Sequence, residues 1–426
     1  MHFYVPVQQQ PCIMTLSAPA SCLFIMVIVA VLLLVCGCTQ PQSAQGAGSA
    51  AVPALNMSVP FAPVPVASEN GINLAYEIAL APPAGMVPVV EKVEVIDAST
   101  GKTLYTEDAG LLASTYHPAS VPPPTPAELQ EGTGKLLTPR ISVWFVVSPD
   151  AIPDQLTHRI TLNRSAEGLP PLVLSGANVI VRKDLAPVVI GAPFSGPGWL
   201  AMETTSPLTH HFGGQITVGN VTRVPQRYAQ DWIYVDPVTG MASSGNATLA
   251  RDYYGFGKEI HAVANGTVIS AQDGLPDLET IYSARPAAFA TLAGNNVIEA
   301  IGNGKYACYG HMENGSVRVQ AGDTVTEGQV IGLMGNSGNS DLPHLHFQVV
   351  TGAPSFLGAE GYPHVYRSFS VIGDVNVTRV EEQQQADPAF VFNRLWSEFG
   401  NFTDFYAQPV AQQDKLVENN AIVQFP

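Results

Sequence analysis

Short stretches in which apolar and polar residues alternate dominate the first half of the chain, and they predict β-strands. Residues 72–78, 91–96, 141–147 and 158–162 alternate in this way, and turn-forming residues separate them. Side chains along a strand point to opposite faces in turn, so each stretch would bury one face and expose the other. Several short strands at this spacing predict an immunoglobulin-like β-sandwich over residues 67–186.

Strand patterns continue in a second region, residues 187–385, where most of the histidines and glycines lie. A C-terminal extension, residues 386–426, is rich in aromatic residues and is expected to pack back on the body. Within it, residues 388–399 have the pattern of a short helix and residues 421–425 that of an extended end. The pattern therefore predicts a mainly β protein.

The N-terminus has the features of an export signal. Residues 22–35 are an apolar run, shorter than the roughly 20 residues of a membrane span but typical of a signal peptide. The following V-C-G-C resembles a lipobox, which predicts a signal peptide over residues 1–38 and a lipid on Cys38. An uncleaved signal anchor is the alternative. Residues 39–66 are rich in Gln, Ser, Ala, Gly and Pro and are predicted to be a flexible linker.

Composition and charge exclude some classes of function. The chain has 426 residues, is 46% hydrophobic and carries a net charge of −16. A basic patch is missing from the sequence, which argues against a nucleic-acid partner. Cys308 is the one cysteine beyond the export signal, so no disulfide framework is expected. A lipobox together with eight Asn-x-Ser/Thr sequons predicts an exported, membrane-anchored protein on a prokaryotic cell surface, with an archaeal host as the more specific hypothesis.

The strongest chemical signal is a pair of histidines, His344 and His346, in an apolar run that predicts a strand. Residues i and i+2 of a strand point to the same face, so both imidazoles would project into one site. Imidazole is a common zinc ligand and the usual general base near neutral pH. One strand could therefore supply a metal ligand and a catalytic base side by side.

The region from about 255 to 350 resembles the LytM/lysostaphin-type zinc metallopeptidases. The resemblance is carried by residues 260–268, by Y-A-C-Y-G-H-M at 306–312, and by G-D-x-V-x-x-G-Q-x-I-G-x-x-G-N-S-G-x-S at 322–340, which leads into H-L-H-F. Part of the last segment also occurs in lipoyl-type β-barrels, which lack the H-x-H and need a modifiable lysine that is not found here. The resemblance implies an antiparallel β-domain with a groove and a peptide-hydrolysing activity.

The resemblance also implies roles for individual residues. In this family the second histidine of H-x-H binds zinc, which corresponds to His346. The first, together with the histidine of the upstream tyrosine segment, serves catalysis, which corresponds to His344 and His311. The other ligands normally come from H-x-x-x-D, and this chain has Asp231 at its end but Arg227 where the histidine is expected.

A replacement for the missing ligand lies upstream, at His210 and His211, before a Q-R-Y-A-x-D segment that looks like a sub-branch of the family. We favour His211, with His210 as the alternative. Adjacent residues on a strand face opposite ways, so we expect only one of the two to bind. The expected site is one Zn²⁺ per chain held by His211, Asp231 and His346. Three protein ligands and an open position for water are the pattern of catalytic zinc.

These observations predict a zinc metalloendopeptidase that cleaves peptides, above all cell-wall peptides, at the cell surface. One alternative is a catalytically degenerate domain that binds wall peptides or a partner enzyme, because Arg227 departs from the family pattern. Another makes the sandwich the functional part, as an adhesion or carbohydrate-binding module.

Overall fold

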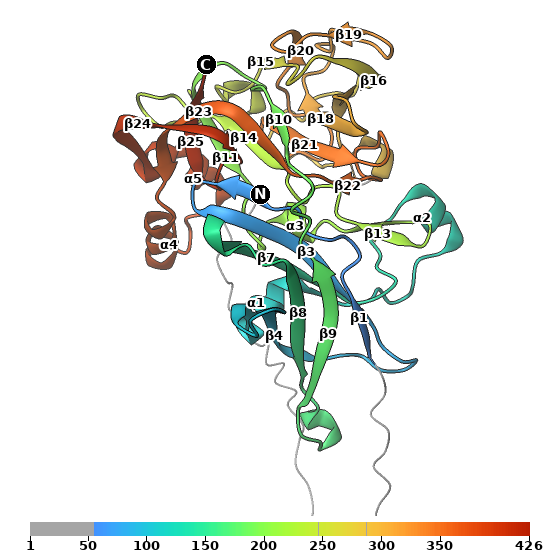
Figure 1. The fold of residues 1–426 in the computed structure, drawn as a ribbon. Coiled ribbons are helices and arrows are strands. Elements are labelled where there is room, and N and C mark those ends of the chain that lie inside the picture. The colour runs from blue at the N-terminus through green and yellow to red at the C-terminus, as the bar shows by residue number, and fades with distance from the viewer. Residues whose placement is uncertain (1–54, 246, 287) are drawn as a thin grey trace, which may run out of the picture.

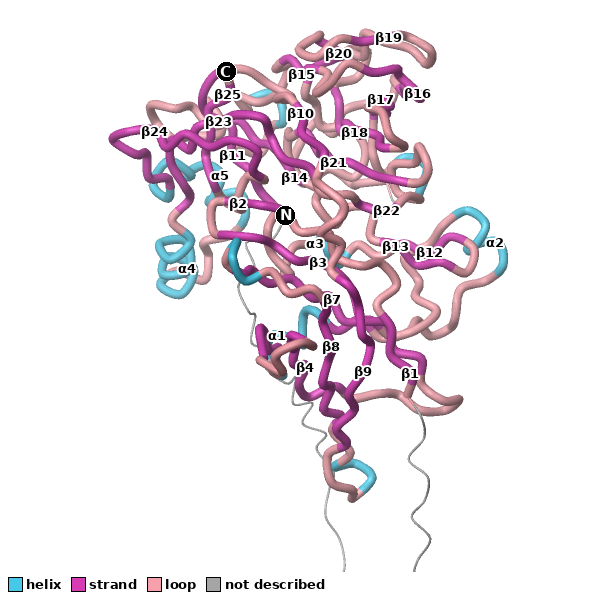
Figure 2. The backbone as a smooth tube through the Cα atoms, viewed as in Figure 1, coloured by secondary structure: helices cyan, strands magenta, loops and turns pink. Residues whose placement is uncertain are grey.

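The computed structural model describes residues 55–245, 247–286 and 288–426. The predicted signal peptide, the lipobox and most of the predicted linker lie outside these residues. Strands form most of the regular structure and the helices are short (Figure 2). The expectation of a mainly β fold is therefore confirmed.

Two antiparallel sheets form the N-terminal part, shown in the lower half of Figure 1. The first has the order β1-β3-β7-β6, with β2 also paired to β3, and the second has the order β5-β4-β8-β9. The strands of the first sheet are β1 (Asn56–Ser58), β2 (Val66–Ser68), β3 (Gly71–Ala81), β6 (Tyr116–His117) and β7 (Arg140–Val147). Those of the second are β4 (Val90–Asp97), β5 (Thr103–Glu107), β8 (Gln155–Leu162) and β9 (Leu172–Ile180).

The two sheets share one hydrophobic core, to which Leu74 and Val143 contribute from the first sheet and Val93 and Ile160 from the second. The four strands predicted from alternation lie within β3, β4, β7 and β8. We call this two-sheet unit the sandwich; its immunoglobulin-like topology and its predicted boundaries stay predictions. Two helices, α1 (Ala109–Thr115) and α2 (Pro126–Glu131), lie in its connections.

The predicted flexible linker is wrong at its C-terminal end. Within residues 55–66, β1 pairs with β3, and Leu55, Val64 and Val66 are buried. The prolines in this stretch suggested a linker, but its apolar residues cover the edge of the sandwich core.

A sheet of 12 strands forms the second part, in the upper half of Figure 1. Its order is β10-β23-β25-β11-β14-β21-β18-β17-β16-β19, with β22 paired to β21 and β24 to β23. The described pairings are antiparallel except β10 with β23. The strands are β10 (Val188–Ile190), β11 (Gly196–Met202), β14 (Gln230–Tyr234), β16 (Gly266–Gln272), β17 (Asn295–Ala300), β18 (Lys305–Met312), β19 (Thr324–Val325), β21 (Leu345–Thr351), β22 (Glu360–Gly361), β23 (His364–Val375), β24 (Thr403–Lys415) and β25 (Ala421–Phe425).

Two small two-stranded sheets and three further helices complete the regular structure of the described residues. One sheet is a hairpin of β12 (Ile216–Val218) with β13 (Val221–Arg223), and the other pairs β15 (Glu259–His261) with β20 (Val330–Leu333); the helices are α3 (His210–Gly213), α4 (Val377–Ala386) and α5 (Phe392–Ser397). Short 3₁₀ turns lie at Pro149–Ala151, Ser165–Glu167, Ala250–Asp252, Phe289–Thr291 and Phe399–Phe402. None of the helices in the described ranges combines the length and the apolar character needed to cross a bilayer.

The C-terminal extension is more than a segment that packs on the body. Its last strand, β25, lies between β11 and β23 inside the large sheet, and four of its five residues are buried. The predicted extended end is thus a central strand of the sheet. The predicted helix over 388–399 corresponds to α5.

Candidate active site

Adjacent strands bring four of the predicted site residues together. Asp231 lies on β14, His346 on β21 with His344 directly before it, and His311 near the end of β18. The register pairs His346 with Asp231 on one side and with Gly310 on the other. Because β21 lies between β14 and β18, the side chains from three strands converge.

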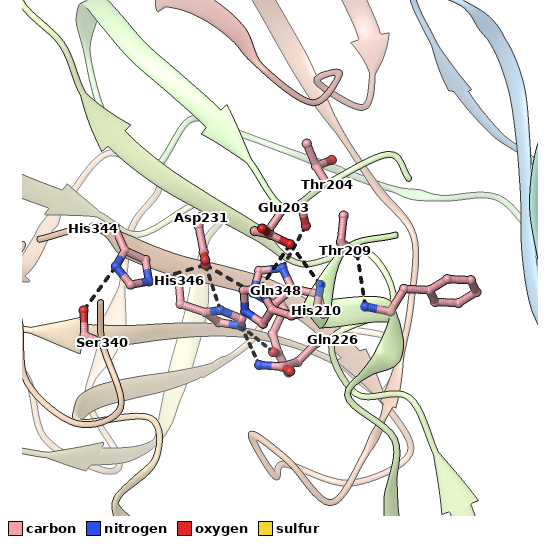
Figure 3. Close-up of polar contacts among 12 residues, drawn as sticks. Glu203, Thr204, Thr209, His210, Gln226, Asp231, Ser340, His344, His346 and Gln348 are labelled. Atoms are coloured by element: carbon pink, nitrogen blue, oxygen red, sulfur yellow. Dashed lines mark hydrogen bonds and ion pairs between the residues drawn. The ribbon is translucent and has the colours of Figure 1, made fainter. Parts of the chain in front are cut away.

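The carboxylate of Asp231 is the centre of this cluster. Its Oδ1 lies 3.0 Å from Nδ1 of His346, 3.3 Å from Nε2 of His211 and 3.5 Å from Nε2 of His344 (Figure 3). Burial raises the pKa of Asp231, but the electrostatic interactions with the neighbouring imidazoles of His211 and His344 outweigh it and hold that pKa well below its ordinary value. The group is therefore a carboxylate at neutral pH.

The local structure around His210 and His211 differs from the expected strand. Both residues lie on α3, where the Thr209 side chain caps the helix by accepting a hydrogen bond from the backbone of Phe212. The argument that adjacent residues must face opposite ways is therefore wrong, because its strand geometry does not apply. His210, His211 and Asp231 each offer one donor atom within 4.8 Å of the others.

His210 and His211 nevertheless have different surroundings. The side chain of His211 is buried, and its Nε2 makes no hydrogen bond although it faces Asp231. The side chain of His210 is 54% exposed, and its Nδ1 lies 3.0 Å from the carboxylate of Glu203. An unpaired buried nitrogen directed at a carboxylate is what a metal ligand presents.

A hydrogen bond on the far side of the ring orients His211. Its Nδ1 donates to the carbonyl oxygen of Glu203 over 2.8 Å, which leaves the lone pair of Nε2 directed at Asp231. Glu203 has φ +55°, a left-handed conformation that residues other than glycine rarely adopt. Such strain concentrates at functional sites, where the surrounding structure maintains it.

His346 is oriented by a two-step relay. The amide nitrogen of Gln348 donates to the carbonyl of Phe356 over 2.7 Å, so Oε1 of Gln348 is turned toward His346. Nε2 of His346 lies 2.8 Å from that oxygen and donates to it. The lone pair of Nδ1 therefore faces Asp231, as a metal ligand requires.

His311 and His344 also direct one free nitrogen into the site. Nδ1 of His311 donates to the carbonyl of Ser337 over 2.8 Å, and Nδ1 of His344 donates to that of Leu342 over 2.7 Å. Their ring centroids are 4.7 Å apart. Burial lowers the pKa of both imidazoles, well below its ordinary value in His311. Both rings are neutral at neutral pH and can accept a proton at Nε2.

The donor set fits a zinc ion. Bonds of about 2.1 Å in a tetrahedral site place neighbouring ligand atoms about 3.4 Å apart. The two distances from Asp231 to the inner nitrogens of His346 and His211, 3.0 and 3.3 Å, are close to that spacing.

An open pocket of about 360 Å³ gives access to the cluster. Asp231, His311, His344 and His346 line it together with His210. Its remaining walls include apolar side chains and one ion pair, provided by Ile216, Leu292, Ala293, Phe356, Leu357, Arg285 and Asp341.

Residues 252–356 match the family model of peptidase family M23. This part of the chain is similar to that family. The predicted LytM/lysostaphin-type resemblance is thereby confirmed, whereas the Q-R-Y-A-x-D sub-branch stays a prediction. The match covers His311, His344 and His346. It begins after His211 and Asp231, so the place of these two residues in the site rests on the structure alone.

Similar proteins match the M23 domain over part of their own length. Endolysin 2638A of Staphylococcus phage 2638A is 35% identical over 94 residues, which are 21% of this chain and 16% of the endolysin. The catalytic domain of the antimicrobial peptidase lysostaphin from Staphylococcus simulans is 24% identical, with 29% of this chain and 83% of that chain covered and a TM-score of 0.19. The catalytic domain of the prophage-encoded M23 protein EnpA from Enterococcus faecalis is 29% identical, with 26% and 76% covered and a TM-score of 0.16.

Arg227 stands at the position where the resemblance implies a histidine. Its side chain forms buried ion pairs beside the part of the chain that matches M23. Its guanidinium is buried and pairs with Glu77 on β3 of the sandwich and with Glu360 on β22. Nη2 donates to Glu77 over 2.9 Å, and Nε donates to Glu360 over 3.1 Å. The residue connects the sandwich to the large sheet.

Sequence reasoning missed two residues that orient the M23 site. Gln348 lies two positions after His346 on the same strand, so the alternation of side chains could have indicated it. Glu203 carries no such signal, because only the fold brings its carbonyl to His211. Outside the site, His261 lies on β15, and Cys308 is buried with its thiol pKa raised by burial.

Proposed function

We propose that the protein is a zinc-dependent metalloendopeptidase that hydrolyses cell-wall peptides. The observation that carries this proposal is the convergence of His211, Asp231 and His346, in which each imidazole directs its inner nitrogen at Asp231 and uses its other nitrogen for a hydrogen bond on the far side of the ring. The match of residues 252–356 to a peptidase family supports it independently.

His211, Asp231 and His346 would hold one Zn²⁺, with His210 as the alternative to His211. We assign His211 because its buried Nε2 faces Asp231, whereas His210 is half exposed and pairs with Glu203. When bound in such a site, zinc lowers the pKa of a bound water to about 7 and polarises the scissile carbonyl.

His311 and His344 would carry the proton transfers. Each presents a neutral Nε2 to the pocket because its Nδ1 donates to a backbone carbonyl. One ring can accept the proton of the attacking water, and the other can hydrogen-bond the developing oxyanion and protonate the leaving amine.

Cell-wall peptides are the proposed substrate class. The pocket is lined near the histidines by the small residues Gly214 and Ala293, which leaves room for a peptide with small side chains. One similar protein is named an endolysin and another an antimicrobial peptidase, which is consistent with such a substrate. We further propose an exported, lipid-anchored protein at the cell surface, on the basis of the sequence of residues 1–38.

The decisive experiment measures zinc content and peptide hydrolysis of purified protein lacking the export signal. We expect one zinc per chain and hydrolysis of purified peptidoglycan peptides, both abolished by chelation and restored by Zn²⁺. Asp231→Ala and His211→Ala should lose most of the zinc, whereas His210→Ala should keep it. A folded wild-type protein without zinc would instead favour the degenerate binding module, and full zinc occupancy in Asp231→Ala would refute the ligand assignment.

A further inference from the structure

The short helix that carries His211 packs directly against the sandwich. Phe212, the next residue, is fully buried, and its ring meets that of Trp144 on β7 edge to face at 5.4 Å. The Trp144 ring also contacts Tyr228 at 5.6 Å, three residues before Asp231. Nε1 of Trp144 donates to Asn73 on β3 over 2.8 Å, so its orientation is set within the sandwich.

A second sandwich segment holds the hairpin that follows this helix. Thr133, just after α2, exchanges two backbone hydrogen bonds of 3.1 and 2.8 Å with Thr217 on β12. Gly219 at the hairpin turn donates to the carbonyl of Leu129 in α2 over 2.6 Å. Figure 1 shows α2 beside β13, at a distance from the rest of the sandwich.

Arg227 is the third connection. It lies four residues before Asp231, pairs with Glu77 and Glu360, and places its guanidinium 5.6 Å from the centre of the Phe212 ring. A buried charge that loses its partner is strongly destabilising, so Arg227 and Glu77 depend on each other. The pair therefore fixes the segment between α3 and β14 against the sandwich.

We propose that the sandwich is a structural part of the metal centre, with Arg227 and Trp144 as positioning residues for His211. This inference rests on the proposed zinc site. A four-residue helix has too few hydrogen bonds of its own to hold a ligand rigidly, so its order must come from packing. The packing partners are sandwich residues on one side and the large sheet on the other. The family pattern would place a ligand histidine at position 227. In this chain Arg227 stands there and stabilises the position of the ligand His211 instead.

Zinc affinity of intact protein tests the proposal, measured by competition with a chelating dye. Glu77→Gln removes the charge of the sandwich partner of Arg227, and Trp144→Leu removes the ring against Phe212. Each should weaken zinc binding roughly tenfold, the lower end of the range for residues that orient metal ligands. Trp144→Phe keeps an aromatic ring and should retain most of the affinity. Circular dichroism of each metal-free variant checks that it is folded at the measuring temperature.

The matched control is Ile160→Ala, which weakens the core of the sandwich away from this interface. It should lower the melting temperature and leave the zinc affinity unchanged. The proposal is overturned if Glu77→Gln and Trp144→Leu bind zinc as tightly as wild type, or if Ile160→Ala weakens binding equally. If Glu77→Gln does not fold, Trp144→Leu with its phenylalanine rescue decides alone. A wild-type protein that binds no zinc would overturn the proposed function itself, which is a different result.

Discussion

Four of the five histidines at the site each use one nitrogen for a hydrogen bond that orients the other nitrogen. The acceptors are backbone carbonyls for His211, His311 and His344, and the side chain of Gln348 for His346. A backbone carbonyl cannot be removed by substitution, but Gln348 can. The orientation of His346 is therefore the one that mutagenesis can test most directly.

Replacing Gln348 by Leu should weaken zinc binding roughly tenfold or more, because His346 loses the acceptor that keeps its proton on Nε2. A buried N–H without a partner would also favour the other tautomer or a turned ring. Zinc competition on the folded variant measures the effect. Gln272→Leu, on β16 of the same sheet and outside the pocket lining, is the control and should bind as wild type. Unchanged affinity in Gln348→Leu would contradict the relay.

His344→Ala and His346→Ala should separate catalysis from metal binding. We expect His344→Ala to keep its zinc and to lose about 10²- to 10⁴-fold in kcat, the usual size of general acid–base catalysis. His346→Ala should lose both zinc and turnover. His311→Ala should behave like His344→Ala. Equal metal loss in His344→Ala and His346→Ala would show that the division of roles is wrong.

At the scale of elements, the central position of β25 explains how the end of the chain supports the site. It pairs with β11 and β23, and β11 in turn pairs with β14, which carries Asp231. Ile422, Val423 and Phe425 are buried, whereas Gln424 between them is exposed. The sequence predicted an extended end here but did not indicate which strands it would join.

Ile422→Ala should lower the free energy of unfolding by about 2–5 kcal/mol, the usual cost of truncating a fully buried isoleucine. Gln424→Ala on the same strand should change it by less than about 0.5 kcal/mol. Urea unfolding of the two variants measures both values. If the two substitutions cost the same, β25 does not occupy the centre of the sheet.

At the scale of the whole molecule, buried neutral histidines make the fold sensitive to acid. In the sandwich, Nδ1 of His158 donates a hydrogen bond to the carbonyl of Ala177, and its Nε2 accepts one from the hydroxyl of Tyr76. Burial lowers the pKa of His158 to about 4. The unfolded chain binds the proton with a pKa of about 6.5. His158 therefore contributes stability that is complete above pH 6.5 and is lost as the pH falls through 4.

His158→Gln should make the free energy of unfolding less dependent on pH between 6.5 and 5. One protonating group contributes a slope of at most about 1.4 kcal/mol per pH unit, and the variant should lack that part. Denaturant unfolding of wild type and His158→Gln at several pH values measures both slopes. The contributions of the titrating groups that the two proteins share cancel in the difference. Identical slopes would show that His158 is already charged in the folded state.

The sequence by itself determined the features that depend on neighbours along the chain. The two-residue spacing of His344 and His346 requires them to share a face of their strand, and alternation placed β3, β4, β7 and β8. The glycine-rich segment before H-x-H and the tyrosine segment at 306–312 are local as well, and they carry the resemblance to LytM/lysostaphin-type peptidases. The strand predictions succeeded because local periodicity and turn chemistry do not depend on which distant strand lies alongside.

Only the tertiary structure decided the rest. Asp231 meets His346 because β14 pairs with β21 in one register, and no local pattern specifies a register between segments more than a hundred residues apart. His211 reaches Asp231 from a helix whose position depends on Trp144 and Arg227, so its orientation could not be derived from strand geometry. A ligand set is a property of distances between distant residues, and those distances exist only once the sheets have packed.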